Sequence, residues 1–119
     1  MKVGIDTVEI NRIEELINNQ KRFLEKVFSN EEREEFSKRK QRPEHIAAAF
    51  CAKEAFSKAI GTGIAGFNFN EVSLLHKENG KPYLSFSGNA QKIVSDLNLS
   101  FDVSITHTDT LATAIVIAF

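Results

Sequence analysis

Cysteine is nearly absent from this sequence, tryptophan is missing, and neither sign of charge dominates. The single cysteine, Cys51, excludes an internal disulfide and a zinc site made of several cysteines. The net charge of −1 argues against a general nucleic-acid-binding protein, because such proteins are usually strongly basic. No apolar run reaches the roughly 18 residues that a membrane-spanning helix requires. We therefore expect no nucleic-acid partner and no membrane.

The rest of the composition is that of an ordinary folded protein. Hydrophobic residues make up 42% and charged residues 26% of the 119 positions, which predicts one domain, residues 1–119, with a modest core. Asp6 stands where a signal peptide would have its apolar segment, so we expect a cytoplasmic protein.

Three common signatures of catalysis or nucleotide binding are also missing. Gly61, Gly63 and Gly66 follow a predicted helix, whereas a P-loop needs a Gly-Lys-Ser/Thr ending in front of one. Neither a serine–histidine–aspartate triad nor a dinucleotide fingerprint is recognisable. The glycine-rich stretch is more simply the end of a helix, with Gly61 as the stop.

Hydrophobic spacing predicts a mixture of strands and helices. The expected elements are a strand over 2–8, helices over 9–19, 23–28, 30–40 and 43–60, strands over 71–77 and 82–87, a helix over 88–97, and strands over 101–106 and 111–119. The last run is nearly all apolar, as in a central strand covered on both faces. The order predicts an α+β fold, a mixed single domain in which a long central helix packs on a mostly antiparallel sheet.

Local signals define where several of these elements begin and end. Ser29 followed by Glu32 is a capping box, which starts a helix. Pro43 suits the first position of the long helix. Asn79-Gly80 between two predicted strands indicates a tight hairpin.

The long helix carries charges where it should be apolar. From Ile46 to Ile60 it is apolar almost all the way round, which is typical of a buried helix. Glu54 and Lys58 lie one turn apart on one side, while Lys53 points elsewhere. Because burying an unpartnered charge is costly, Glu54 and Lys58 must either pair with each other or face a polar ligand.

A second carboxylate has an apolar setting near the N-terminus. Asp6 stands among Val3, Ile5 and Val8, close to the point where the first strand gives way to a helix. One interpretation is that Asp6 caps that helix. The other is that Asp6 and Glu54 converge as two hard oxygen ligands, a set that suits Mg²⁺ when water and substrate phosphate complete its shell.

Three further residues allow a structural interpretation as well as a chemical one. His107 lies in Ser104-Ile-Thr-His-Thr108, whose hydroxyl groups suit phosphate oxygens, although a lone histidine is more often structural. Lys81 is by default a solvated hairpin residue. Cys51 is most simply a small buried apolar residue.

Basic and acidic residues are interleaved between positions 20 and 42. The simplest interpretation is a solvated helical face with ion pairs between neighbouring turns. Alternatively, Lys38–Arg42, together with Arg12 and Arg22, forms a docking surface for an acidic partner. The sequence leaves both interpretations open.

Four segments resemble the holo-acyl-carrier-protein synthases, the small bacterial phosphopantetheinyl transferases. They are Gly4–Ile13, Phe50–Ile64, Asn79–Tyr83 and Ser104–Thr108, and they follow the family's order and spacing over essentially the whole chain. The resemblance implies the 4′-phosphopantetheinyl transferase fold. It also implies a reaction in fatty acid biosynthesis that moves 4′-phosphopantetheine from coenzyme A to a serine of apo acyl carrier protein and releases adenosine 3′,5′-bisphosphate.

The resemblance further implies a role for each matching residue. Asp6 and Glu54 match the magnesium ligands. Lys58 matches the lysine at the pyrophosphate, and His107 matches the histidine beside the coenzyme A phosphates. The implied catalytic residues are thus Asp6, Glu54, Lys58 and His107. The remaining matches to the coenzyme A site are Gly61, Asn79, Gly80, Lys81, Pro82, Ser104 and Thr108.

The resemblance also implies protein partners. Arg12 matches a basic residue that contacts the acidic recognition helix of the carrier protein. The resemblance therefore implies that the basic patch of Arg12, Arg22 and Lys38–Arg42 binds this acidic partner. Members of the family are typically homotrimers with active sites at subunit interfaces, an arrangement in which Asp6 and Glu54 meet across two chains.

One position departs from the family, and some alternatives remain. Ala49 stands where many relatives have arginine, which removes a phosphate or partner contact that Lys53 is a candidate to replace. The base for the serine proton is open between Glu54, Asp6 and a metal-bound water. Two other functions use the same residues: a non-catalytic module that binds acidic proteins or a nucleotide, and a magnesium-dependent phosphohydrolase.

Overall fold

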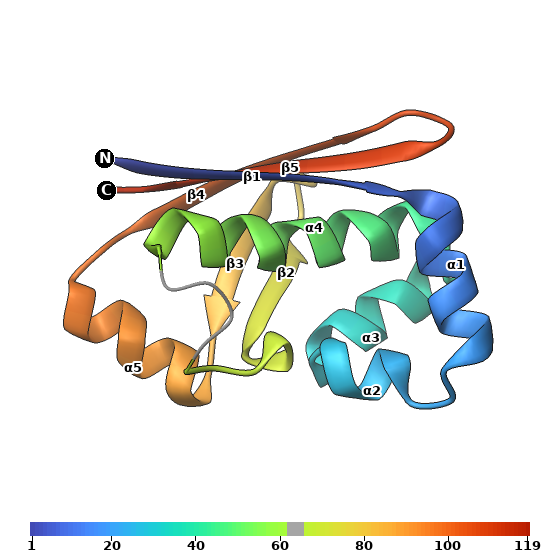
Figure 1. Ribbon diagram of the computed structural model, residues 1–119, viewed down its shortest axis with the longest axis horizontal. Helices are drawn as coiled ribbons and strands as arrows, with labels where there is room; N and C mark the ends of the chain where they lie inside the picture. Colours follow the sequence, from blue (N-terminus) through green and yellow to red (C-terminus); the bar gives the residue numbers. More distant parts are fainter. Residues whose placement is uncertain (62–65) are drawn as a thin grey trace.

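A computed structural model describes residues 1–61 and 66–119 of the chain. Its strands form two antiparallel sheets, one in the order β1-β5-β4 and one of β2 and β3. The predicted α+β class, long central helix and antiparallel pairing are confirmed (Figure 1). In chain order the elements are β1 (Lys2–Glu9), α1 (Ile10–Asn19), α2 (Phe23–Val27), α3 (Asn30–Lys38), α4 (Pro43–Ile60), the 3-10 turn η1 (Phe69–Glu71), β2 (Val72–His76), β3 (Pro82–Phe86), α5 (Gly88–Leu97), β4 (Phe101–His107) and β5 (Leu111–Ala118).

The long helix α4 lies along one face of the three-stranded sheet (Figure 1). Gly4 of β1 allows the two backbones to touch, because a β-carbon at this position would lie 1.9 Å from the Ala55 carbonyl oxygen and 2.6 Å from the Ala59 nitrogen. The buried residues of β5 that share this face, such as Ala112 and Ala114, are also small. This close approach brings side chains of β1 within reach of side chains of α4.

Both ends of α4 lie where the local signals predict them. Pro43 is the first residue of the helix. Gly61 follows the last turn with a left-handed φ of 77°, a conformation that glycine adopts without steric cost. The predicted glycine-rich stretch continues into residues 62–65, including Gly63, which lie outside the described part of the chain.

The predicted capping box starts α3. The Ser29 hydroxyl accepts a hydrogen bond from the Glu32 nitrogen, and the Glu32 carboxylate accepts one from the Ser29 nitrogen. The helix ends at Lys38, slightly earlier than predicted. Lys40 and Gln41 have φ values of 59° and 55°, a left-handed conformation that a right-handed helix cannot continue through.

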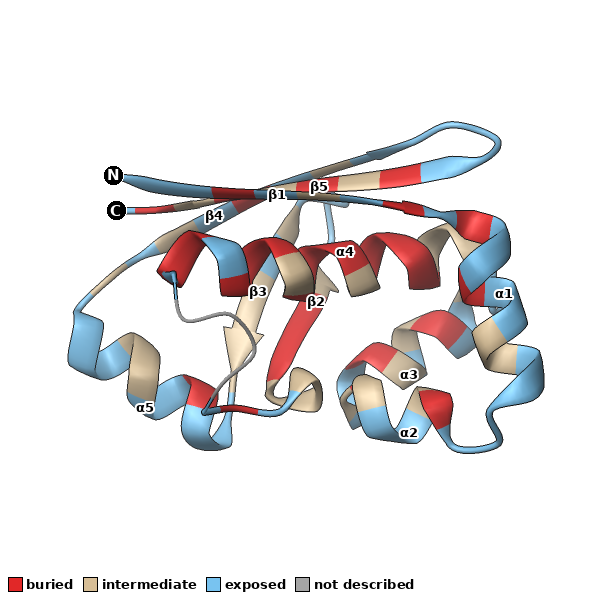
Figure 2. Ribbon diagram, in the orientation of Figure 1, coloured by how far each residue is buried: buried red, intermediate tan, exposed pale blue. Residues whose placement is uncertain are grey.

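The central strand β5 is covered on one face only, so the prediction that both faces are covered is wrong for a single chain. Its buried residues alternate with half-buried ones, since α4 covers only the inner face of the sheet (Figure 2). The outer face carries exposed apolar side chains, with Val3 59% and Ile5 57% exposed on β1.

The structure also bears on membrane insertion. None of the helices within residues 1–61 and 66–119 combines the length and the apolar character that crossing a bilayer would require.

Candidate active site

Asp6 lies on the face of β1 that meets α4. It is in the middle of the strand, in register with Ala114 of β5, and only 18% of its side chain is exposed. The first residue before α1 is Glu9, and no side chain makes a capping hydrogen bond there. The interpretation of Asp6 as a helix cap is therefore wrong, because the strand continues past it and places its carboxylate against α4.

The ammonium of Lys58 reaches from α4 to β1. Lys58 Nζ donates to Asp6 Oδ1 at 3.2 Å and to the Ile5 carbonyl oxygen at 3.0 Å. No ion pair joins Lys58 to Glu54 among the residues that the structure describes. Of the two alternatives for this helix, a salt bridge between Glu54 and Lys58 is thus excluded in the described chain, and the Lys58 side chain is 53% exposed.

Glu54 shares the electrostatic environment of these two residues. Its partial burial raises its pKa, and the nearby Asp6 carboxylate raises it further. Lys58 and Arg12 act in the opposite direction. Four charged groups from β1, α1 and α4 therefore surround one point on the surface, and Asp6 and Glu54 are already neighbours within one chain.

Cys51 lies behind this cluster as the sequence predicts. It is fully buried, and its thiol donates to the Ala112 carbonyl oxygen at 3.3 Å. Burial, followed by the adjacent Asp6 carboxylate, raises the pKa of the Cys51 thiol to about 12. The thiol stays protonated at neutral pH and is not a nucleophile or a metal ligand.

The residues at this point fit a hard divalent cation. Asp6 and Glu54 offer carboxylate oxygens from two elements, and the effect of Asp6 on the pKa of Glu54 shows that the two anions repel each other. A cation between them would remove that repulsion. Two carboxylates are a donor set that Mg²⁺ typically uses, with water and substrate oxygens completing its shell. Within the described ranges no three acidic, histidine or cysteine side chains gather as a metal-binding group.

His107 lies at the end of β4, two residues beyond Ile105, which is in register with Asp6 through Ala114 of β5. It is the last residue of β4, is exposed, and its Nδ1 lies 3.4 Å from the Thr108 carbonyl oxygen. The Thr108 hydroxyl closes the turn into β5, because it accepts hydrogen bonds from the nitrogens of Thr110 and Leu111.

A basic pocket surrounds His45, and sequence reasoning missed this histidine. The pocket has a volume of about 250 Å³ and is lined by Lys38, Arg39, Lys40, Arg42 and His45. Burial lowers the pKa of His45, and positive charge on Arg39, Arg42 and His107 lowers it further. His45 Nδ1 is buried without a hydrogen-bond partner in the described chain. The run of basic residues before Pro43 was the sequence signal for this pocket, but the same run is equally typical of a solvated helix face.

The remaining residues predicted to bind coenzyme A do not all lie close together in one chain. Gly61 ends α4, while His107 lies near its start, and a helix of 18 residues is about 27 Å long. Ser104 is exposed on the outer face of β4, opposite the face that meets α4. One chain therefore does not bring all the predicted coenzyme A residues to one place.

The hairpin between β2 and β3 forms as predicted. The Asn79 side-chain oxygen accepts a hydrogen bond from the Lys81 nitrogen at 3.0 Å, and Gly80 has a left-handed φ of 88°. The turn leads into Pro82, the first residue of β3. In the described part of the chain no hydrogen bond or ion pair connects the turn to Asp6.

The two arginines predicted for docking lie at opposite ends of α1. Arg12 is exposed in its first turn, close enough to influence the pKa of Glu54. Arg22 follows the helix and pairs with Glu25 at 3.3 Å, with both side chains largely exposed. The structure thus brings Arg12, but not Arg22, beside the acidic pair.

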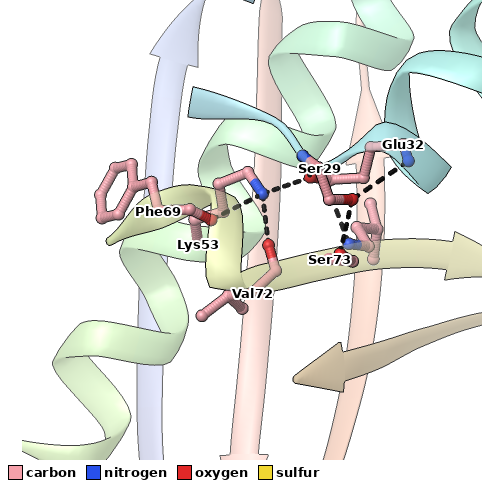
Figure 3. A network of polar contacts seen from close by, with 7 residues as sticks. Ser29, Glu32, Lys53, Phe69, Val72 and Ser73 are labelled. Carbon is pink, nitrogen blue, oxygen red and sulfur yellow. Dashed lines mark hydrogen bonds and ion pairs between the residues drawn. The ribbon is translucent and has the colours of Figure 1, made fainter. Parts of the chain in front are cut away.

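Lys53 cannot replace the arginine that this chain lacks. Its side chain is fully buried and pairs with Glu32 at 2.5 Å, so the prediction that it contacts a phosphate or partner is wrong (Figure 3). Ala49 is also buried, with 1% of its surface exposed. Sequence reasoning noticed Lys53 in an apolar helix but could not identify a partner 21 positions away.

Comparison with known proteins gives one consistent family. A model of the 4′-phosphopantetheinyl transferase superfamily matches residues 2–115. The holo-[acyl-carrier-protein] synthase of Caldanaerobacter subterraneus subsp. tengcongensis is 38% identical over 117 residues, which cover 98% of this chain and 92% of the relative. The enzyme of the same name from Clostridium perfringens is 41% identical, covering 94% of this chain and 88% of the relative.

A solved structure agrees with the sequence matches. The crystal structure of Helicobacter pylori holo-[acyl-carrier-protein] synthase in complex with coenzyme A has a TM-score of 0.86 and 30% identity. The match covers 98% of this chain and 99% of the other. The similarity therefore extends over nearly the full length of both chains.

Proposed function

The chain belongs to the 4′-phosphopantetheinyl transferase superfamily, and we propose that it acts as a holo-acyl-carrier-protein synthase. It transfers 4′-phosphopantetheine from coenzyme A to a serine of apo acyl carrier protein and releases adenosine 3′,5′-bisphosphate. The observation that carries the proposal is the convergence of Asp6, Glu54 and Lys58 from β1 and α4 at one exposed point. The coenzyme A complex of the Helicobacter pylori relative supports the choice of donor.

In this reaction the serine oxygen bonds to the phosphorus that carries the pantetheine arm. The bond from that phosphorus to the bridging pyrophosphate oxygen breaks, and adenosine 3′,5′-bisphosphate leaves with the electron pair. We propose Asp6 and Glu54 as ligands of Mg²⁺, which when bound supplies positive charge to the pyrophosphate. Lys58 is exposed enough to turn toward the leaving phosphate and neutralise it.

Glu54 is the best candidate among these residues to accept the serine proton. Its pKa is raised by burial and by the Asp6 carboxylate, which makes it a stronger proton acceptor than an ordinary glutamate.

Coenzyme A needs positive charge for its phosphates, and the basic pocket around His45 offers it. We propose that His107 and this pocket bind phosphate, with Thr108 in the same turn. Gly61, Asn79, Gly80, Lys81, Pro82 and Ser104 are proposed to line the rest of the coenzyme A site. Their separation within one chain supports a site shared between subunits.

The function is tested by incubating the protein with coenzyme A, Mg²⁺ and apo acyl carrier protein, and measuring the carrier's mass. Addition of one phosphopantetheine to its serine is the expected result. Release of phosphate without modification would indicate a phosphohydrolase, and binding without either product would indicate a non-catalytic module. Omitting Mg²⁺ tests the metal requirement in the same assay.

We also propose that the active assembly is a homotrimer. The outer face of the three-stranded sheet supports this, because it carries apolar side chains on the side of the sheet away from α4. Its exposed or half-buried apolar residues are Val3, Ile5, Ile115, Ile117 and Phe119. Patches of this kind mark protein interfaces.

An aspartate in this face is expected to break the assembly. Ile5 is 57% exposed in one chain, so Ile5→Asp costs a monomer little, whereas a buried charge would destabilise a subunit interface. Sedimentation should give about three times 13.3 kDa for the natural protein and 13.3 kDa for the variant. Lys92→Asp, on exposed α5, is the matched control. A natural protein that sediments as a monomer contradicts the trimer.

Arg12 and Arg22 are proposed to dock the acidic carrier protein. The position of Arg12 beside Glu54 supports this, since the carrier's serine must reach the same point. Arg12→Glu should raise the KM for carrier protein by about tenfold or more, because it places like charges opposite each other. The KM of the natural protein should also rise between about 50 and 200 mM salt as charges are screened. Lys92→Glu is the control, and a salt-independent KM would argue against electrostatic docking.

The cellular setting follows from the substrates. We propose that residues 1–119 act as one domain in the cytoplasm, in fatty acid biosynthesis. Fractionation of cells, with the protein detected by antibody, should recover it in the cytoplasmic fraction together with acyl carrier protein.

A further inference from the structure

A fully buried ion pair joins α3 to α4, and the proposed mechanism uses neither of its members. The side chains of Glu32 and Lys53 have no exposed surface, and Lys53 Nζ lies 2.5 Å from Glu32 Oε1. Removing two charges from water is costly, and their mutual attraction offsets that cost only when further hydrogen bonds satisfy both groups.

Every N–H donor of the Lys53 ammonium has a hydrogen-bond partner. Its Nζ donates to Glu32, to the Phe69 carbonyl oxygen at 3.1 Å and to the Val72 carbonyl oxygen (Figure 3). An ammonium has three N–H donors, so none is left unpaired. The ring centroid of Phe28 lies 5.1 Å from Nζ and adds a cation–π contact. These bonds hold α4 to η1 and to the start of β2.

Glu32 is satisfied in the same way. Its Oε1 also accepts from the Ser29 nitrogen, and its Oε2 accepts from the Leu74 nitrogen, each at 3.0 Å. Ser29 is in turn hydrogen-bonded to the Ser73 hydroxyl at 2.7 Å (Figure 3). Burial raises the pKa of Glu32 and lowers that of Lys53, while each partner opposes the shift of the other. One connected set of directional bonds therefore joins α3, α4 and β2.

We propose that the Glu32–Lys53 pair is a positioning device, which sets the rotation of α4 so that Glu54 and Lys58 meet Asp6 in the geometry needed for transfer. The inference rests on the proposed function. Lys53 immediately precedes Glu54, about 100° away around the helix axis. Lys53 is bonded toward α3 and β2, whereas Lys58, one turn beyond Glu54, donates to Asp6 on β1.

A small rotation of α4 would matter at the site. A glutamate carboxylate lies about 6 Å from the helix axis, so a rotation of about 10° moves it by about 1 Å. Displacements of this size can lower a rate by about 100-fold. Packing of Gly4 against Ala55 and Ala59 sets the distance between β1 and α4, but it supplies no directional bond against rotation.

Stability alone does not account for the pair. Replacing a buried ion pair by apolar side chains of similar size is often neutral or stabilising, while removing one partner leaves an uncompensated charge. Directional bonds to two backbone carbonyls and two backbone nitrogens specify an orientation, which apolar packing does not.

The test uses the full chain with Lys53→Met, with Glu32→Gln, and with both changes together. Glu35→Gln is the matched control, because Glu35 lies one turn further along α3 and also bonds β2, through the His76 nitrogen at 3.0 Å. In the described structure Glu35 makes no bond to α4. The measurements are kcat and KM for coenzyme A, thermal unfolding, and a crystal structure of the double variant.

We expect Lys53→Met to lose thermal stability and the double variant to recover most of it, because the double variant contains no unpaired charge. In both, kcat should be about 30- to 100-fold lower, with KM for coenzyme A within about twofold. The crystal structure should show Lys58 Nζ displaced by about 1 Å from its 3.2 Å contact with Asp6. Glu35→Gln should retain kcat within about twofold.

A kcat that recovers together with stability in the double variant would overturn the proposal, since a merely structural role predicts that result. An unchanged position of α4 in the crystal structure would also overturn it. If the natural protein transfers nothing, the proposed function fails, and the crystal structure still decides whether the pair sets the rotation of α4.

Discussion

Replacing Glu54 by glutamine is expected to lower kcat for phosphopantetheine transfer by about 1,000-fold, or about 4 kcal/mol of activation free energy. The change keeps the size of the side chain but removes its charge and its capacity to accept a proton. The folded protein should be slightly more stable, because the raised pKa of Glu54 shows that the native structure disfavours the charged form. The mass-shift assay and thermal unfolding measure the two effects.

The opposite signs of these two effects make the prediction specific. A loss of activity caused by damage to the fold would come with a lower melting temperature. Glu35→Gln, the same change at another partly buried glutamate, should have little effect on transfer. Asp6→Asn should resemble Glu54→Gln in activity. Full turnover by either active-site variant would contradict the assignment of the acidic pair.

Gly4→Ala is expected to destabilise the protein by about 3 kcal/mol and to lower transfer by about 100-fold. The new β-carbon would lie 1.9 Å from the Ala55 carbonyl oxygen, which belongs to the backbone of α4 and cannot move aside alone. β1 must therefore shift away from α4 and carry Asp6 away from Lys58. Chemical denaturation measures the first effect, and the mass-shift assay measures the second.

The control for this prediction separates crowding from backbone strain. Gly61→Ala adds the same methyl group at a position with a left-handed φ of 77°, where no atom of the described residues lies within 4 Å of the new β-carbon. It should cost only about 1 kcal/mol, the ordinary penalty for a left-handed alanine. Equal destabilisation by the two variants would show that close packing of β1 on α4 is not the cause.

Boundaries of the elements were predictable because their signals act over a few residues. The Ser29–Glu32 capping box, Pro43 at the start of α4, Gly61 at its end and the Asn79-Gly80 hairpin all appear where the sequence indicates. In each case the hydrogen bond or the backbone angle involves neighbours in the chain, so the residue types suffice to specify it.

Partners of the charged residues were not predictable in the same way. Helical spacing placed Glu54 and Lys58 together, but Lys58 pairs with Asp6, 52 positions away. The fully buried ammonium is Lys53 rather than Lys58, and its partner Glu32 lies on another helix. An ion pair depends on which elements pack together, and hydrophobic periodicity does not contain that information.

In the candidate site, too, the sequence indicated the residues, but only the packing of the elements decided which of them lie together. Resemblance named Asp6, Glu54, Lys58 and His107, yet only packing shows that the first three gather while His107 lies near the start of α4 beside His45. The basic pocket likewise depends on a turn with two left-handed residues, which no local pattern revealed.

By itself the sequence determined the order of strands and helices, their ends, and the residue types available for phosphate and metal chemistry. Tertiary structure decided which charges are buried, which are paired and which are exposed. The physical reason is distance along the chain: caps and turns are made by neighbours, whereas the burial and pairing of a charge depend on elements that meet only after folding.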